Sequence, residues 1–187
     1  MIKILFIRHA ESEYSRDGIY AGKVDCNLTS SGLESAKKFG KTLDNSFDAI
    51  YCSPLKRVKQ TLNAIFPEAH PIYDERISAT SIGIWENQKK SSLDKHLVEL
   101  FRKGLYNPPG AETHSDVDKR VCSFVEELFE QYQNNEKILV ITHNGILRSV
   151  ERNFIKSEQK LISDTLRTII LDNSNYDWYK SKEEAIK

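Results

Sequence analysis

The chain lacks the features that mark membrane-spanning and polyanion-binding proteins. No apolar stretch in the sequence approaches the length of a membrane span. Neither sign of charge is in excess, because 27 Lys and Arg residues balance 27 Asp and Glu residues. A balanced chain has no global field to attract nucleic acid or an anionic membrane. We therefore expect neither as a partner, and any anion site must be local and built by a few cationic side chains.

Cysteine is scarce, and its spacing fits neither a disulfide framework nor a metal site. Cys26, Cys52 and Cys122 are widely separated, form no C-x-x-C and cannot all pair with one another. The sequence also has no H-E-x-x-H, no EF-hand loop and no Cys/His ligand cluster, so we expect no metal. Its first residues pass directly into a strand-like run without the cleavage site of a signal peptide. Together these features predict a cytoplasmic protein with reduced thiols.

The order of apolar patterns predicts an α/β fold. Apolar runs at 2–7, 47–53 and 137–142 read as strands, and segments with helical periodicity separate them. This alternation predicts a three-layer α/β/α arrangement with a mostly parallel central sheet, in a single domain over 1–187. Prolines and glycines break the pattern across 67–112, which we interpret as a small cap that carries substrate selectivity.

Two local predictions concern the ends of elements. Ser31 and Glu34 have the spacing of a capping box at the start of the first long helix. Near the end of the chain, 166–171 and 176–179 read as the two strands of a hairpin, with the turn at 172–175.

Cationic and imidazole side chains follow each of the three predicted strands. The first strand ends in Arg8 and His9, Arg57 follows the second by one helical turn, and the third ends in His143. Ligands of open α/β sheets bind outside the carboxyl ends of the strands. The sequence therefore predicts one crevice that collects two arginines and two histidines.

Those residue types suit a phosphoryl group. Arginine stays charged and presents a planar fork of donors, and a neutral imidazole can attack phosphorus to form a covalent intermediate. The helix expected after Asn144 and Gly145 would add backbone donors at its N-terminus. A second histidine, protonated by anionic surroundings, would add a charge-assisted hydrogen bond.

Each of these residues has an ordinary interpretation when taken alone. A lone Arg-His pair is more often a polar strand end, Arg57 a surface residue and His143 a turn residue; their joint occurrence after three strands reverses those odds. His70, His96 and His114 lie in polar contexts, and we expect them on the surface.

Two other phosphate chemistries do not fit the spacing. Residues 18–24 look superficially like a P-loop, but the segment is one residue short and has no Ser or Thr after the lysine. Cys52 precedes Arg57 by five positions, and cysteine-dependent phosphatases use six.

Five motifs, in order along the chain, resemble those of the histidine phosphatase superfamily, the phosphoglycerate-mutase-like enzymes. The segment at 8–11, RHAE, is similar to R-H-G-E, and DCNLTSSG at 25–32 to D-x-x-L-T-x-x-G. SPLKRVKQT at 53–61 resembles S-x-L-x-R-x-x-Q-T, and PGAET at 109–113 resembles P-G-G-E-S. HNGILR at 143–148 resembles H-G-G-x-x-R. Each match is weak alone, and the ordered set is specific.

The resemblance implies a phosphatase that works through a phosphohistidine on His9, with Arg8, Arg57 and His143 holding the phosphoryl group. It further implies no metal and no organic cofactor. The residues expected to contact substrate are Ser15, which stands where the family often has asparagine, and Gly22, Asn144 and Gly145.

One departure from the family pattern bears directly on catalysis. The family's proton donor is a glutamate in L-x-E-x-x-x-G-x-W-E-G, and here Ala79 occupies its position. Alanine cannot protonate a leaving group, and a missing general acid costs about 10²–10⁴-fold in rate. Glu75 and Glu86 are nearby candidates for the role, although neither matches the motif position.

The loss at position 79 leaves several functions open. The main one is a metal-independent phosphomonoesterase acting on a phosphorylated small molecule or a phosphoprotein. The alternatives are a phosphatase for good leaving groups, such as protein phosphohistidine, and a catalytically weak phosphate-binding protein. A phosphoglycerate-type mutase is the least favoured, because mutases of this family usually carry a larger insertion than 67–112. The sequence predicts no particular oligomeric state.

Overall fold

A five-stranded sheet forms the centre of the protein. The computed structural model describes residues 1–44, 46–155 and 166–184. The strands are β1 (Lys3–Arg8), β2 (Ala49–Cys52), β3 (Ile72–Tyr73), β4 (Lys137–Thr142) and β5 (Thr168–Asp172). Their order is β3-β2-β4-β1-β5, with every pair parallel except β5, which runs antiparallel to β1. The predicted α/β fold with a mostly parallel sheet is confirmed.

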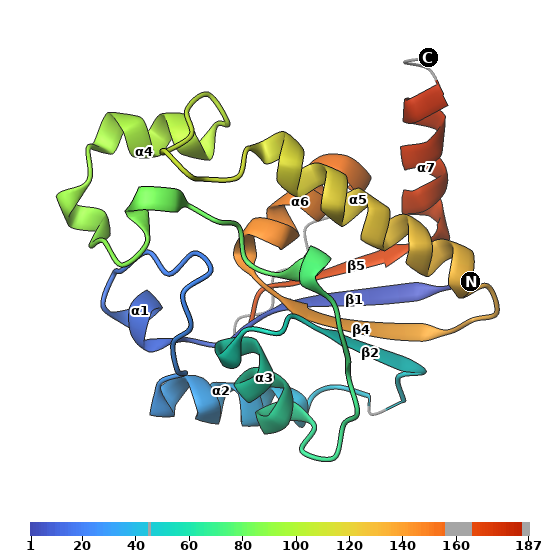
Figure 1. The fold of residues 1–187 in the computed structure, drawn as a ribbon. Helices are drawn as coiled ribbons and strands as arrows, with labels where there is room; N and C mark the ends of the chain where they lie inside the picture. Colours follow the sequence, from blue (N-terminus) through green and yellow to red (C-terminus); the bar gives the residue numbers. More distant parts are fainter. Residues whose placement is uncertain (45, 156–165, 185–187) are drawn as a thin grey trace.

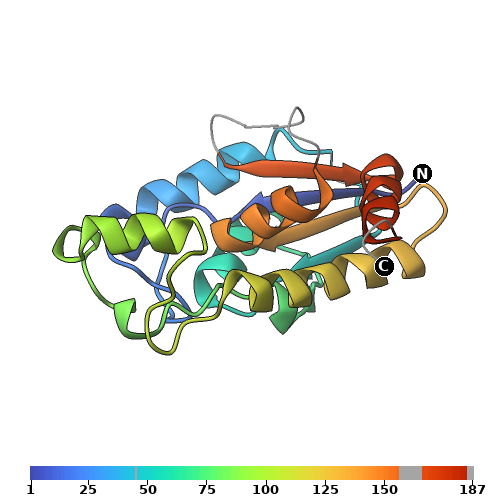
Figure 2. The ribbon, with the colours of Figure 1, turned by 90° about the horizontal axis from the view of Figure 1, so that it is seen from above.

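Helices cover both faces of the sheet and complete the three layers (Figures 1 and 2). One face packs against α2 (Ser30–Gly40) and α3 (Lys56–Ile65). The other packs against α5 (His114–Gln131), α6 (Asn144–Phe154) and α7 (Asn173–Glu184). Within the described residues, no helix is long and apolar enough to span a membrane.

The central strands are buried on both faces, which explains their unbroken apolar sequence. Successive side chains of a strand point to opposite faces. In β4, Ile138 and Val140 join the cluster under α5 and α6, whereas Leu139 and Ile141 join the cluster under α2 and α3. Such two-sided burial is typical of parallel sheets.

The smaller elements gather beyond one end of the sheet, where Figure 1 shows α1 and α4. They are α1 (Glu13–Arg16), η1 (Glu75–Ile77), η2 (Gly83–Trp85), η3 (Lys90–Ser92) and α4 (Lys95–Arg102). Buried Trp85 packs there with Ile82 and Val98 in a small apolar cluster of its own. The segment 67–112 begins at the sheet, because β3 pairs with β2 before the chain leaves for this cluster.

The predicted C-terminal hairpin is wrong. Its first half is β5, but its second half lies in helix α7. The Asp172 carboxylate accepts hydrogen bonds from the backbone N–H groups of Ser174 (2.9 Å) and Asn175 (3.3 Å), and so starts a helix where a turn was expected. Tyr176 and Tyr179, three residues apart, then lie on one helical face and pack into the core.

The first long helix also starts differently from the prediction. Its N-cap is Thr29, whose hydroxyl accepts from Gly32 N–H at 2.9 Å. Ser31 lies inside the helix and donates instead to the Glu11 carboxylate at 2.8 Å. Glu11 thus ties the start of α2 to the loop that follows β1.

Gly32 provides a test of this contact. A Cβ at Gly32 would collide with the backbone carbonyl oxygen of Glu11. We expect Gly32→Ala to destabilise the protein by about 1–3 kcal/mol, because overpacking against backbone cannot be relieved by a rotamer change. Denaturant unfolding measures the loss, with Glu34→Ala on the exposed side of α2 as the control. Equal stability of the two variants would contradict the contact.

Candidate active site

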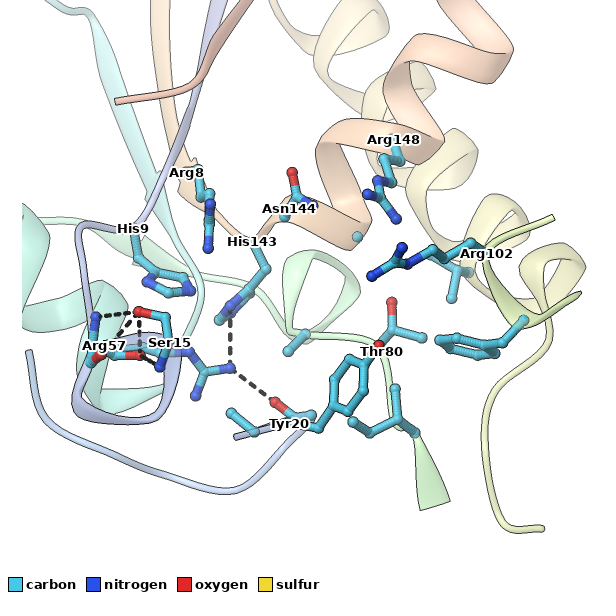
Figure 3. Close-up of a pocket in the computed structure, with 18 of the residues that line it drawn as sticks. Arg8, His9, Ser15, Tyr20, Arg57, Thr80, Arg102, His143, Asn144 and Arg148 are labelled. Atoms are coloured by element: carbon cyan, nitrogen blue, oxygen red, sulfur yellow. Dashed lines mark hydrogen bonds between the residues drawn. The ribbon is translucent and has the colours of Figure 1, made fainter. Parts of the chain in front are cut away.

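A cavity of about 250 Å³ opens at the carboxyl ends of β1 and β4 (Figure 3). Four of the side chains that line it are Arg8, His9, Arg57 and His143, which we call the inner cluster. The structure therefore brings together the four residues that the strand ends predicted.

The register of β1 against β4 places the two histidines. Arg8 pairs with Thr142 across the parallel ladder, so the next residue of each strand enters the cavity. The His9 N–H donates to the Thr142 carbonyl at 2.8 Å. As a result the ring centroids of His9 and His143 lie 5.2 Å apart, edge to face.

His9 is held as a neutral imidazole with a defined tautomer. Its Nδ1 lies 2.7 Å from the Ala10 carbonyl oxygen. A carbonyl only accepts, so Nδ1 carries the proton and Nε2 keeps its lone pair. Burial, followed by the charges of Arg57 and Arg8, lowers the pKa of His9 to about 3. The ring therefore offers an unprotonated nitrogen at neutral pH.

Arg57 is buried without a carboxylate partner. Its guanidinium donates to the backbone carbonyls of Val24 (2.9 Å) and Gly22 (2.8 Å), and its Nη2 lies 3.3 Å from His143 Nδ1. Gly22, predicted to contact substrate, lines the cavity and positions Arg57 through its carbonyl. Carbonyl partners fix the fork without forming an ion pair with it, and the carboxylates of Asp25 and Glu86 offset only part of the effect of burial on its pKa, which stays lowered.

His143 completes the inner cluster as a neutral ring. Arginine can only donate, so His143 Nδ1 accepts from Arg57 and Nε2–H donates to the Ser53 hydroxyl at 2.8 Å. Burial is the largest cause that holds the pKa of His143 well below its usual range, followed by the charges of His9, Arg57 and other cations. The sequence predicted that anionic surroundings would protonate this second histidine. For the protein without a ligand that prediction is wrong, because the side chains around His143 are cationic.

Arg8 carries a buried donor with no acceptor. Within the described part of the chain its Nε has no hydrogen-bond partner. Burial and then the charges of Arg167, Arg148 and Arg57 lower its pKa. Buried donors are nearly always satisfied, so an unpaired one in a cavity points to a ligand that accepts.

The remaining predicted contact residues also line the cavity. The Ser15 hydroxyl is engaged in capping α1, donating to the Ser12 carbonyl at 2.9 Å and accepting from Ser12 N–H at 2.8 Å. Asn144 and Gly145 form the first turn of α6, whose N-terminus faces the cavity. A Cβ at Gly145 would come within 2.6 Å of Thr80 Oγ1, so glycine permits the close approach of the loop at Thr80.

No carboxylate faces this cavity in the part of the chain that the structure describes. Ala79 lines it and is buried. Glu75 instead accepts from the Ser78 hydroxyl at 2.9 Å, and Glu86 accepts from the N–H groups of Lys23 (3.1 Å) and Ile82 (3.3 Å). The structure places neither glutamate among the lining residues.

Several lining residues escaped the sequence reasoning, namely Tyr20, Thr80, Lys90, Arg102, His114 and Arg148. The surface placement expected of His114 is wrong, because its half-buried ring lies 6.3 Å from the Phe101 ring in the cavity wall. Arg148 had a signal, since it follows Asn144 by four residues and so shares its helix face. The cap residues had none, because only the tertiary fold brings α4 over the strand ends.

Among the described residues, no group of three or more His, Cys, Asp or Glu side chains is arranged to hold a metal ion. The polar groups that converge in the cavity are donors, and their chemistry suits an anion.

The tautomer and charge of His9 are open to measurement. We expect its imidazole to be neutral at pH 5 and protonated at Nδ1, because burial and two arginines lower its pKa to about 3. Proton–nitrogen NMR of ¹⁵N-histidine-labelled protein reports both properties, with His9→Gln to assign the signal. A His9 ring that titrates near the free value of about 6.5 would contradict the assignment.

Comparison with known proteins agrees with this geometry. The sequence profile described as "Histidine phosphatase superfamily (branch 1)" matches residues 4–180. Phosphoserine phosphatase 1 of Hydrogenobacter thermophilus is 30% identical over 158 residues, covering 80% of this chain and 74% of that protein. The 2,3-bisphosphoglycerate-dependent phosphoglycerate mutase of Rhizobium etli is 29% identical over 180 residues, covering 89% and 85%.

Solved structures share the fold. Bacillus stearothermophilus YhfR superimposes with a TM-score of 0.75 at 26% identity, covering 82% of this chain and 80% of that one. A mycobacterial glucosyl-3-phosphoglycerate phosphatase superimposes with a TM-score of 0.76 at 20% identity, covering 83% and 82%. The chain, matched over nearly its full length by the family profile, belongs to branch 1 of the histidine phosphatase superfamily.

Proposed function

We propose that this protein is a metal-independent phosphatase that acts through a covalent phosphohistidine on His9. The observation that carries the proposal is the neutral His9 ring, fixed by the Ala10 carbonyl with Nε2 unprotonated. It lies beside two arginines, and no acceptor in the described part of the chain satisfies the buried Nε of Arg8. A nucleophile and an anion site meet in one cavity.

The inner cluster accounts for both steps of such a reaction. Arg8 and Arg57 donate to the oxygens of the phosphoryl group as its charge redistributes, and His143 joins them once its Nδ1 takes up a proton. His9 Nε2 attacks phosphorus; an N–P bond forms, and the bond to the leaving group breaks with its electron pair. Water then attacks phosphorus, the N–P bond breaks, and His9 recovers its lone pair as inorganic phosphate departs.

A bound phosphoryl group would also change the state of His143. A dianion within a few ångströms raises the pKa of a histidine, because it favours the charged form. Proton uptake on binding would turn the His143 bond to phosphate into a charge-assisted one. The second histidine would then act as a cation only when the substrate is present.

The relatives include both phosphatases and mutases. Besides the phosphoserine phosphatase and the mutase above, the adenosylcobalamin/α-ribazole phosphatase of Escherichia coli is 27% identical over 154 residues. Two observations favour a phosphatase here. A mutase must protonate and deprotonate hydroxyl groups of its substrate, whereas Ala79 occupies the acid position and no described carboxylate lines the cavity. The cap is also short.

Two alternatives follow from the same alanine. One is a phosphatase for phosphohistidine in proteins, whose imidazole leaves without a strong acid. The other is a phosphate-binding protein of low activity that keeps the inner cluster. The main proposal takes a phosphorylated small molecule as substrate, because the cavity of about 250 Å³ has the scale of a small ligand's phosphate end. The cytoplasmic location expected from the sequence is part of the same proposal.

The nucleophile is tested with p-nitrophenyl phosphate in excess EDTA. We expect turnover by the wild type, loss of it in His9→Ala, and little change in His70→Ala, since His70 is exposed and outside the cavity. Rapid quenching without acid, followed by mass spectrometry, should locate a labile phosphate on His9. Turnover that survives in His9→Ala, or phosphate on another residue, would overturn the proposal.

The role of position 79 is tested by restoring an acid. Ala79 is buried in the cavity wall, so a carboxyl there would face the leaving group. We expect Ala79→Glu to raise kcat/KM for an alkyl phosphate such as n-butyl phosphate by about 10²-fold, within the usual range for a general acid. Ala79→Gln has nearly the same size and no acid, and serves as the control. An equal response of the two variants would contradict the role.

A further inference from the structure

Besides Arg152, which is paired with Asp118, three cationic side chains of the cavity take no part in the proposed mechanism. Lys90 lies in η3, Arg102 at the end of α4 and Arg148 in α6, and all three line the cavity. They are exposed and so stand at its open mouth. We call them the cationic mouth.

The charges of the cationic mouth are not neutralised by the protein. Within the described residues, none of the three forms an ion pair, whereas neighbouring cations do: Lys103 pairs with Glu99 at 2.7 Å and Arg152 with Asp118 at 2.6 Å. Lys90 also lies 5.3 Å from the centre of the Tyr20 ring, a contact that leaves its ammonium donors available. Among the described residues, the lack of an ion pair is therefore particular to these three side chains, because their paired neighbours include Arg152, which also lines the cavity.

The three side chains are close enough to repel one another. Desolvation and then the charges of Arg8 and Arg102 lower the pKa of Lys90. Desolvation and then Arg167 and Arg102 lower the pKa of Arg148. Glu151 offsets part of this effect on Arg148. Like charges held together cost free energy, which an anion between them would recover.

The two arginines of the cationic mouth lie on the side of the cavity opposite the nucleophile. In Figure 3 the Arg102 and Arg148 guanidinium groups converge above Thr80, and His9 lies at the far side beyond His143. In phosphoryl transfer the attacking and leaving atoms stand roughly in line with phosphorus. A leaving group expelled by His9 would depart towards Thr80 and the two arginines.

We propose that the leaving group is itself a phosphate, so that the bond cleaved is a phosphoanhydride, and that the cationic mouth binds the departing phosphate in place of a proton donor. This inference rests on the proposed phosphatase function. It accounts together for two features that are otherwise unrelated, the alanine at the acid position and, among the described residues, two arginines without ion pairs on the leaving-group side.

The chemistry balances without an acid. His9 Nε2 forms the N–P bond as the P–O bond to the bridging oxygen breaks, and that oxygen leaves with the electron pair as part of a phosphate anion. In pyrophosphate that already carries a proton on the departing end, the leaving group is HPO4²⁻, a weak base whose bridging oxygen needs no further proton, whereas an alkoxide requires one. Hydrolysis of the phosphohistidine by water then releases the second phosphate and one proton.

The charge of the mouth favours phosphate over other good leaving groups. Imidazole and nitrophenolate carry at most one charge, and a carboxylate carries one. A departing phosphate carries two or more, spread over oxygens that match the planar donor forks of Arg102 and Arg148. Three unpaired cations suit the most highly charged of these groups.

The test compares leaving groups in excess EDTA, using inorganic pyrophosphate, acetyl phosphate, n-butyl phosphate and p-nitrophenyl phosphate. We expect the wild type to prefer pyrophosphate to acetyl phosphate and to n-butyl phosphate in kcat/KM. Arg102→Gln and Arg148→Gln should each lower the ratio of kcat/KM for pyrophosphate to that for p-nitrophenyl phosphate by about tenfold, the effect of one charge-assisted hydrogen bond. Lys103→Gln is the matched control, since Lys103 follows Arg102 but lies outside the cavity.

The outcomes separate this inference from the function on which it rests. Equal turnover of n-butyl phosphate and pyrophosphate, or an unchanged ratio in both arginine variants, would overturn the phosphoanhydride assignment. A preference for acetyl phosphate would indicate that the leaving group is a carboxylate, and would also overturn the phosphoanhydride assignment. In all these cases, turnover of p-nitrophenyl phosphate that depends on His9 would still support the proposed phosphatase function. Absence of that turnover would overturn both the phosphatase function and the phosphoanhydride assignment.

Discussion

The parallel pairing of β1 with β4 is the constraint on which the site depends. Because Arg8 lies opposite Thr142 in the ladder, the residues that follow leave the sheet side by side. A one-residue slip would exchange the two faces of a strand and send its apolar side chains out of their clusters. The buried core on both faces of the sheet therefore fixes the register, and the register fixes the 5.2 Å separation of the His9 and His143 rings.

A second constraint is the way the cavity keeps its positive charge. Arg57 is buried yet bonded to backbone carbonyls, which orient its fork without cancelling its charge. Burial and then this positive charge lower the pKa of both histidine rings, and so keep His9 unprotonated. One electrostatic arrangement thus prepares the nucleophile and the anion site together. The nearby carboxylates of Glu86 and Glu75 accept instead from a backbone N–H group and a hydroxyl outside the cavity.

The cap determines which side chains face the leaving group, on the side of the phosphoryl group away from His9. It packs around Trp85 as a small apolar cluster, which carries Lys90 and Arg102 to the mouth of the cavity. In the proposed mechanism the protein stabilises a leaving anion with fixed cations where its relatives' motif carries an acid. A fixed cation and a donated proton both offset the negative charge that builds on the departing oxygen.

By itself the sequence determined the layered fold, its parallel sheet and the inner cluster. Local patterns suffice for these, because an apolar run indicates a buried strand and the polar residues that follow it, Arg8-His9 and His143, mark where the strand ends. It misplaced the hairpin at 176–179, because alternation over a few residues does not reveal that the tyrosines pack on a helical face against the core. It also missed His114 and the cationic mouth. Arg148 had a local signal in its spacing from Asn144, but Lys90, Arg102 and His114 reach the cavity only when η3, α4 and the start of α5 pack over the strand ends, a long-range arrangement that no local pattern encodes.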